Sequence, residues 1–180
     1  MLTIRVDRYE TLLRELARRG GGVQESGAFL LTPLDAATQC GSRPITGITY
    51  YDDLDPACLT GGITFGAIGY SALNEHCRRH GLQVAADIHT HPGTLVRQSH
   101  LDRSNPMIAL PGHVAIIAPR FAQGVIEPTD LGVHVFAGAG NWTSSYGHAV
   151  TEVVSLEPIG GGSFSPLRFI RRLFSRGHRR

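Results

Sequence analysis

Residues 85–106 read AADIHTHPGTLVRQSHLDRSNP, and this stretch predicts both a central strand and a metal site. The apolar run that leads into His89 predicts a buried strand, and Pro92 ends it because proline has no amide hydrogen for the sheet. His89 and His91 are two residues apart, so on an extended chain their side chains share one face, roughly 6.6 Å apart along the strand. Two imidazoles in this arrangement can bind one metal ion.

A third metal ligand is expected further along the same segment. Ser99 is suited to be the N-cap of a short helical turn. That turn would bring the carboxylate of Asp102 back toward the two histidines. Two neutral imidazoles and one carboxylate suit Zn²⁺, and three protein ligands leave the fourth tetrahedral position for water. The sequence therefore predicts one catalytic zinc ion rather than a structural one.

Amide hydrolysis at such a site also needs a proton carrier and a donor to the developing oxyanion. Zinc lowers the pKa of a bound water to about 7, and a carboxylate outside the ligand set usually takes the proton. Among the upstream acids, Glu25 is the candidate base because it directly precedes Ser26, Gly27 and a short buried strand. Ser99 is the candidate oxyanion donor, and loss of one such donor typically costs about 2.7 to 4 kcal/mol of activation free energy.

The rest of the chain alternates between helical and strand patterns. Helices are expected at residues 9–19, stopped by the glycines at 20–22, and at residues 63–80, closed by Gly81. A loop is expected at residues 52–56. Strands are expected at residues 28–32, 44–51, 82–89, 113–118, 131–136 and 150–156. Helices interleaved with short mixed strands predict an α/β (α+β) domain with a central mixed β-sheet flanked by helices.

Composition bounds the organisation of the chain. With 180 residues, of which 42% are hydrophobic and 18% charged, one folded domain with a sizeable core is expected. We place this domain at residues 1–157, a Gly/Ser/Pro linker at 158–166 and an arginine-rich tail at 167–180. No run approaches the ~20 apolar residues of a membrane span, and the first ten residues lack a signal-peptide core, so the expected location is the cytoplasm.

The formal net charge of +2 hides an asymmetry between domain and tail. Residues 1–157 hold eleven basic and fifteen acidic side chains, a net of −4, whereas the tail holds six arginines. A mildly acidic domain does not suit nucleic-acid binding. In the tail, Leu167, Ile170, Leu173 and Phe174 share one helical face. This pattern suits docking on an acidic partner or an anionic lipid surface, and equally a solvated tail, so the partner of the tail stays unassigned.

Other cysteines, histidines and aromatic residues are expected in structural roles. Cys40, Cys58 and Cys77 are odd in number and form no C-x-x-C pair, which disfavours a disulfide framework or a cysteine-ligated zinc site. His76 and His80 share a helix face without a third close ligand, so no second metal is expected there. Sheet or loop positions are expected for His113, His134 and His148. Three aromatic residues suit either the core or a groove wall: Phe65, Tyr70 and Trp142.

Together, Glu25, the run His89-Thr90-His91-Pro92, Ser99 and Asp102 resemble the JAMM motif of the JAB/MPN metalloproteases, E…H-[ST]-H-P-x6-S-x2-D, at the spacing of that family. The resemblance covers residues 1–157 and implies an MPN, cytidine-deaminase-like fold. It implies that His89, His91 and Asp102 bind zinc, that Glu25 is the acid/base and that Ser99 stabilises the intermediate. It also implies a ubiquitin-like protein as substrate, whose extended tail lies beside an exposed strand.

Weaker similarity in residues 105–119 and 140–142 is to small bacterial JAB proteins encoded beside ubiquitin-like, E1-like and E2-like components. This similarity implies deconjugation or precursor processing, with antiphage defence as one setting. Two alternatives remain: a processing peptidase for a sulfur-carrier ubiquitin-like protein in cysteine or cofactor biosynthesis, and a non-catalytic MPN scaffold. All 17 basic residues are arginines, which reflects either genomic base composition or avoidance of lysine as a conjugation acceptor.

Overall fold

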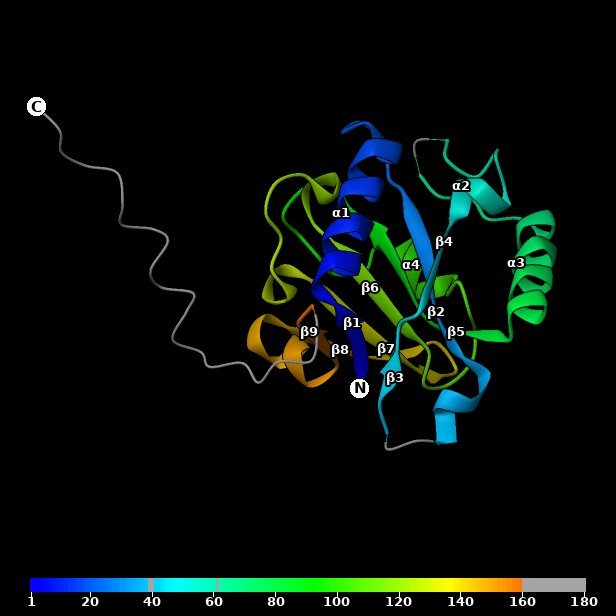
Figure 1. Cartoon of the computed structure of the whole chain (residues 1–180). Coiled ribbons are helices and arrows are strands. Elements are labelled where there is room, and N and C mark those ends of the chain that lie inside the picture. The colour runs from blue at the N-terminus through cyan, green and yellow to red at the C-terminus, as the bar shows by residue number, and fades with distance from the viewer. Residues whose placement is uncertain (39–40, 61, 160–180) are drawn as a thin grey trace, which may run out of the picture.

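A six-stranded mixed sheet forms the centre of the protein in a computed structural model that describes residues 1–38, 41–60 and 62–159 (Figure 1). The strand order is β4-β2-β5-β6-β7-β8. Its strands are β2 (Gly27–Pro33), β4 (Gly47–Tyr50), β5 (Leu82–Thr90), β6 (Val114–Ala118), β7 (Gly132–Gly138) and β8 (Asn141–Tyr146). Only β5 and β6 pair in parallel, and the other pairs are antiparallel. The predicted α/β class with a central mixed sheet is confirmed.

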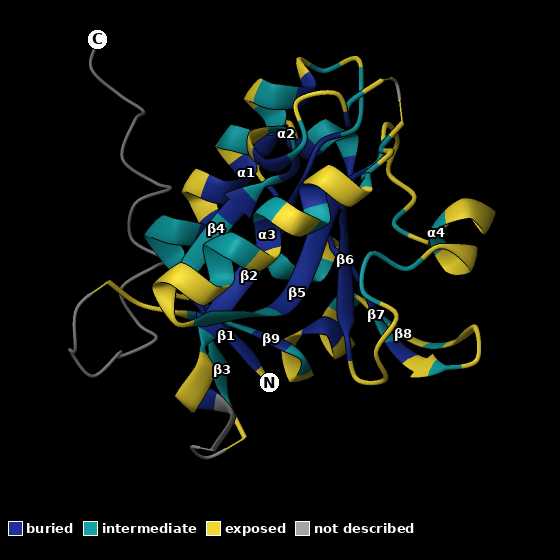
Figure 2. Ribbon diagram, turned by 90° about the vertical axis from the view of Figure 1, so that its right-hand side faces the viewer, coloured by how far each residue is buried: buried dark blue, intermediate teal, exposed yellow. Residues whose placement is uncertain are grey.

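Helices cover both faces of this sheet because its central strands alternate apolar side chains to the two sides. From β2, Ala28 and Leu30 join the core cluster under helix α1 (Val6–Gly20). Phe29 and Leu31 join a second cluster with α2 (Tyr51–Leu54) and α3 (Ala67–His80). Figure 2 shows β2, β5 and β6 as the buried centre, with the short helix α4 (His100–Ser104) projecting from it. A strand buried on both faces reads as a continuous apolar run, which is why β2 was recognisable.

Both long helices end where the sequence predicted. Gly21 follows α1 in the left-handed region at φ 59°, and its amide donates to the Ala17 carbonyl at 3.0 Å. Gly81 ends α3 in the same way, at φ 64°. Glycine adopts this conformation without the steric cost that a Cβ imposes.

Other predicted boundaries need correction. The helix predicted at 63–80 begins only at Ala67. Phe65 lies before it and packs its ring against Phe29 and Tyr51, with centroids 5.3 and 5.4 Å apart. The loop predicted at 52–56 is partly helical, as α2. The strand predicted at 44–51 is divided into β3 (Arg43–Pro44) and β4.

A second, three-stranded sheet was not predicted. It has the order β3-β1-β9, in which β1 (Leu2–Arg5) pairs in parallel with β9 (Val154–Glu157). The strand predicted at 150–156 is therefore wrong in part: residues 147–152 form the 3₁₀ helix η4, and β9 belongs to this smaller sheet. The 3₁₀ turn buries Val150 in the main core, which explains the apolar pattern without a strand.

Three remaining short 3₁₀ helices are η1 (Leu34–Thr38), η2 (Arg120–Ala122) and η3 (Pro128–Asp130). Within the part of the chain that the structure describes, no helix is long and apolar enough to cross a membrane. Cys58 and Cys77 are free thiols, while Cys40 lies outside the described residues. The predicted linker, except Pro158 and Ile159, and the predicted tail also lie outside them, so the division into domain, linker and tail stays a prediction.

Candidate metal centre

The centre lies at the end of β5, where the chain leaves the sheet. Because β5 and β6 are parallel, their connection must run from the end of β5 back to the end of the sheet at which β6 begins. This connection contains α4. His89 and Thr90 are the last residues of β5, and both are buried. His91 follows, with its amide donating to the Ala118 carbonyl at the end of β6 at 2.9 Å. Both histidines are therefore fixed by strand pairing.

The structure brings His89, His91 and Asp102 together. The two Nε2 atoms are 3.2 Å apart. Asp102 Oδ1 lies 3.7 Å from His89 Nε2, and Asp102 Oδ2 lies 3.4 Å from His91 Nε2. Ligand atoms held at 2.0–2.1 Å from a tetrahedral zinc ion are separated by about 3.3–3.4 Å. The 3.2 and 3.4 Å distances are close to this value, whereas the 3.7 Å distance, to the other Asp102 oxygen, is longer. Among the described residues, this is the one group of three or more His, Cys, Asp or Glu side chains close enough to hold a metal ion.

A capping box at the start of α4 orients Asp102. Ser99 is the N-cap, and its Oγ accepts from the Asp102 amide at 3.1 Å. In return, the Ser99 amide donates to Asp102 Oδ2 at 2.7 Å. This reciprocal arrangement satisfies two amides that a helix start otherwise leaves free. It places the carboxylate beside the histidines, as the predicted N-cap at Ser99 required.

The loop between His91 and α4 is fastened to the sheet. His91 Nδ1 lies 3.1 Å from the Leu95 carbonyl, which can only accept, so Nδ1 carries the proton and Nε2 presents its lone pair to a metal. One residue on, the Val96 carbonyl accepts from His134 Nε2 at 3.0 Å. Gly132 lets the loop pass, because a Cβ there would lie 2.0 Å from the Val96 oxygen.

Glu25 comes from the segment before β2 and reaches the same cleft. Its neighbour Ser26 donates from Oγ to the Leu16 carbonyl at 2.8 Å and from its amide to Thr90 Oγ1 at 3.0 Å. Ser26 thus ties this segment to both α1 and the end of β5. Gly27 pairs with His89 in the sheet. Glu25 is half-buried and stands outside the group of metal-ligand atoms, where a proton carrier is needed.

Electrostatics separate the two carboxylates. Burial is the main influence on Glu25 and raises its pKa; the Asp102 charge adds to this, and His89 and His91 oppose it. Burial also acts on Asp102, but its hydrogen bonds with the side chains of His89, His91 and Ser99 outweigh it and hold the pKa of Asp102 far below its ordinary value. Asp102 therefore stays ionised as a ligand, whereas Glu25 is the better proton acceptor.

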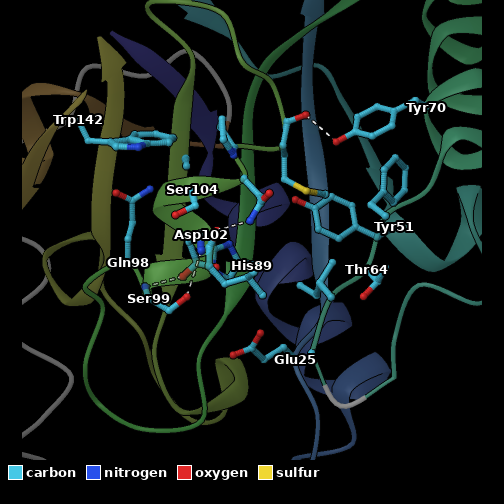
Figure 3. A pocket seen from close by; sticks show the side chains of 18 residues that line it. Glu25, Tyr51, Thr64, Tyr70, His89, Gln98, Ser99, Asp102, Ser104 and Trp142 are labelled. Carbon is cyan, nitrogen blue, oxygen red and sulfur yellow. Dashed lines mark hydrogen bonds and ion pairs between the residues drawn. The ribbon is translucent and has the colours of Figure 1, made fainter. Parts of the chain in front are cut away.

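A cleft of about 800 Å³ runs over this centre (Figure 3). Of the predicted site residues, Glu25, His89, Ser99 and Asp102 line it, and His91 does not. Figure 3 shows Gln98 and Trp142 on one side of the centre and Thr64, Tyr51 and Tyr70 on the other. Phe65, Tyr70 and Trp142, which the sequence left between core and groove, all line the cleft, and Phe65 and Tyr70 also pack on the second core cluster.

A buried polar cluster beneath the cleft was missed by the sequence analysis. Asp87 is 1% exposed, and its Oδ1 lies 2.6 Å from His113 Nε2. Its Oδ2 accepts from the Tyr51 hydroxyl at 3.2 Å, and Tyr51 also lines the cleft. The signal was a charged residue inside the apolar run from Val84 to Ile88. Buried carboxylates need such partners, so this cluster fixes Tyr51 under the site.

Other predicted histidines keep structural positions. His113 directly precedes β6, His134 lies in β7, and His148 lies in η4. On α3, His80 Nδ1 lies 2.8 Å from the His76 carbonyl, and neither ring belongs to a group of metal ligands among the described residues.

Comparison with known proteins shows the fold and leaves the function open. No protein family matches the sequence in a scan. A solution structure of a protein from Desulfitobacterium hafniense matches at TM-score 0.59 and 17% identity, over 88% of this chain and 94% of that one. A second solution structure, from Salinibacter ruber, matches at TM-score 0.51 and 16% identity, over 79% and 88%.

A crystal structure of a JAB1/MPN domain protein from Archaeoglobus fulgidus is also similar. It matches at 15% identity over 88% of this chain and 97% of that one, with a TM-score of 0.40. This likeness is too loose to carry an argument, and the two closer ones concern the fold alone.

Proposed function

We propose that this protein is a zinc-dependent peptidase or isopeptidase. The observation that carries the proposal is the convergence of His89, His91 and Asp102, whose closest atoms are 3.2, 3.4 and 3.7 Å apart. These separations are close to those among the ligands of a tetrahedral zinc ion, and three protein ligands would leave one position for water or substrate. Two imidazoles and one carboxylate also form a donor set that zinc accepts readily. The resemblance to the JAMM motif supports the same assignment.

Each site residue has a role in this proposal. A bound zinc ion would polarise the scissile carbonyl and make the attacking water acidic enough to lose a proton near neutral pH. Glu25 would accept that proton and pass it to the leaving amine, for which its raised pKa is suited. Ser99 Oγ accepts from the Asp102 amide, and its own hydroxyl would donate to the oxyanion.

The substrate in this proposal is a ubiquitin-like protein or its conjugate, cut just after its C-terminus. Gly62, Ile63 and Thr64 line the cleft, and Figure 3 shows Thr64 across the centre from Ser99. A narrow, extended tail could run between that segment and the metal centre, adding backbone hydrogen bonds. E1-like and E2-like proteins of the same system are the further partners. Cytoplasmic location and a role in antiphage defence remain part of the proposal.

The decisive experiment combines metal analysis with cleavage by the full chain. We expect one zinc per chain, cleavage of a ubiquitin-like fusion, and loss of cleavage with a chelator. Glu25→Gln should keep zinc and lose cleavage, His89→Ala should lose both, and the matched control His76→Ala should lose neither. Absence of zinc binding would overturn the proposal and favour the non-catalytic scaffold.

A panel of substrates separates the two enzymatic readings. Fusions of conjugation-type and sulfur-carrier ubiquitin-like proteins should be compared by kcat/KM under the same conditions. Preference for the conjugation type is expected. Preference for the sulfur-carrier type would assign the protein to precursor processing in biosynthesis, with the same site chemistry.

A further inference from the structure

A second, smaller cleft of about 280 Å³ lies beside the metal centre, and Arg97 and Arg103 both line it. We propose that this cleft binds the carboxylate of an acidic side chain on the substrate. The proposal rests on the proposed function, because it describes the polypeptide that the metal centre would cut. It adds a charge preference that the motif residues do not contain.

The two arginines are unusual because nothing in the described structure neutralises them. The region 1–38, 41–60 and 62–159 contains eleven arginines, and the other nine each donate to a carboxylate, a hydroxyl or a backbone carbonyl. The guanidinium groups of Arg97 and Arg103 have no hydrogen bond or ion pair with any residue of that region. No acidic residue lines the cleft. Two unpaired cations at one cleft favour an anionic ligand.

Two residues shared by both clefts connect the smaller cleft with the metal centre. Gln98 and Trp142 line both clefts. The Trp142 indole donates to the Arg103 carbonyl at 3.2 Å, and its ring packs on Phe136 with centroids 4.9 Å apart. Figure 3 shows both shared residues on the same side of His89 and Asp102, away from Tyr51 and Tyr70. A chain bound across the metal centre would therefore continue toward the arginines.

The floor of the cleft is rigid and polar without being charged. His134 is 1% exposed, and its ring contacts Ser144 Oγ at 2.8 Å through Nδ1 and the Val96 carbonyl at 3.0 Å through Nε2. Because a carbonyl only accepts, Nε2 carries the proton and Nδ1 accepts from Ser144. Burial lowers the pKa of His134, so the ring stays neutral. The bond to Val96 also holds the backbone next to Arg97.

A carboxylate fits this set of donors better than other groups of an unmodified polypeptide. Guanidinium groups bind carboxylates through charge-assisted, often bidentate hydrogen bonds. The hydroxyl of Tyr146, which also lines the cleft, is available as a further donor. The volume of about 280 Å³ accommodates one side chain rather than a folded element. Glutamate or aspartate next to the scissile bond is therefore the expected ligand.

The test measures binding, so its reading does not depend on cleavage. The full-length Glu25→Gln protein, supplied with zinc, is titrated with a short peptide blocked at both ends that contains one Glu, and with the matching Gln peptide. Trp142 is the single tryptophan of the chain, so indole fluorescence reports this cleft directly, and calorimetry gives the affinity if the emission does not change. We expect the Gln peptide to bind about tenfold more weakly or worse.

Variants identify the groups that create this preference. Arg97→Gln with Arg103→Gln should abolish the difference between the two peptides, whereas the control Arg78→Gln, whose native partner is Glu75, should retain it. A Gln peptide with a free C-terminal carboxylate should bind as weakly as the blocked one. Equal affinity for Glu and Gln peptides, a preference that survives in the double variant, or tight binding of the free chain end would each overturn the proposal. Failure of peptidase activity alone would leave these binding results unaffected.

Discussion

Replacing Gly27 by alanine tests the packing that holds the candidate site together. A Cβ at this position would lie 2.2 and 2.6 Å from two ring carbons of Tyr51 and 2.9 Å from the Ile88 carbonyl oxygen. Ordinary carbon contacts need about 3.5 Å or more, so the ring would have to retreat by about 1 Å. Tyr51 has no room to do so, because it is fully buried against Phe29, with ring centroids 4.8 Å apart, and bonded to Asp87.

The expected cost is that of an overpacked core, about 1–3 kcal/mol of unfolding free energy. Gly20→Ala is the matched control, because its Cβ would meet Ser26 at an ordinary 3.6 Å at the end of α1. It should be neutral or gain up to about 1 kcal/mol. Urea unfolding followed by circular dichroism measures both. For a domain of this size, the loss at Gly27 corresponds to a melting temperature lower by about 2–12 °C.

Gly27→Ala should also weaken metal binding. Gly27 pairs with His89 in the sheet, and the added Cβ would clash with the carbonyl oxygen of Ile88, the residue directly before His89. Zinc affinity measured by competition with a chromogenic chelator should therefore fall in Gly27→Ala and stay unchanged in Gly20→Ala. A free energy of unfolding of Gly27→Ala within about 0.5 kcal/mol of the natural protein, the range of a neutral surface substitution, would contradict the predicted clash.

Three further predictions concern the site. Ser99→Ala should lower kcat about 10²–10³-fold with zinc content unchanged, because the Ser99 amide still holds Asp102; a kcat within threefold would restrict Ser99 to capping. Burial opposes protonation of His91, but Asp102 and the Leu95 carbonyl outweigh it and raise its pKa above 6.5 in the metal-free protein. Protons therefore compete with zinc for His91. Chelator titrations should show the zinc affinity falling as the pH falls through that pKa. A zinc affinity that does not change between pH 5.5 and 8, on either side of about 6.5, would contradict this. The same shift stabilises the metal-free fold at low pH, and this stability is lost as pH rises through the raised pKa. Asp87→Asn should cost about 1.5–3 kcal/mol in urea unfolding by weakening the bond to His113, and an unchanged midpoint would refute that role.

The metal-ligand group was predictable because its geometry is local. Strand alternation places His89 and His91 on one face, and an N-cap at Ser99 determines where Asp102 points. The two-sided burial of β2 was equally readable from its unbroken apolar run. For Glu25, position could be proposed from the sequence, but its approach to the centre depends on the pairing of Gly27 with His89, which no local pattern encodes.

Elements that depend on distant partners were missed or, like β9, predicted only in part. Strand β8, with the sequence NWTSSY, has exposed and half-buried side chains only and so lacks an apolar signal. Strands β1 and β9 are four residues each and lie at opposite ends of the described region, so neither suggests the other. The Asp87 cluster needs His113 and Tyr51 from two other segments. Which arginines stay unpaired likewise depends on every neighbouring segment.

His89, His91 and Asp102 fall within fourteen consecutive residues, whereas Glu25 precedes them by more than sixty. The candidate metal ligands and the candidate proton carrier therefore lie on separate segments of the chain. Under the proposed function, one substitution at Glu25 would leave a protein that binds its substrate at the metal ion without cleaving it. Loss of the segment 89–102 would instead remove both substrate binding at the metal and cleavage. Under the proposed function, a single substitution would therefore turn a peptidase into a binding protein. A chain that has lost the metal ligands would need several substitutions to regain activity.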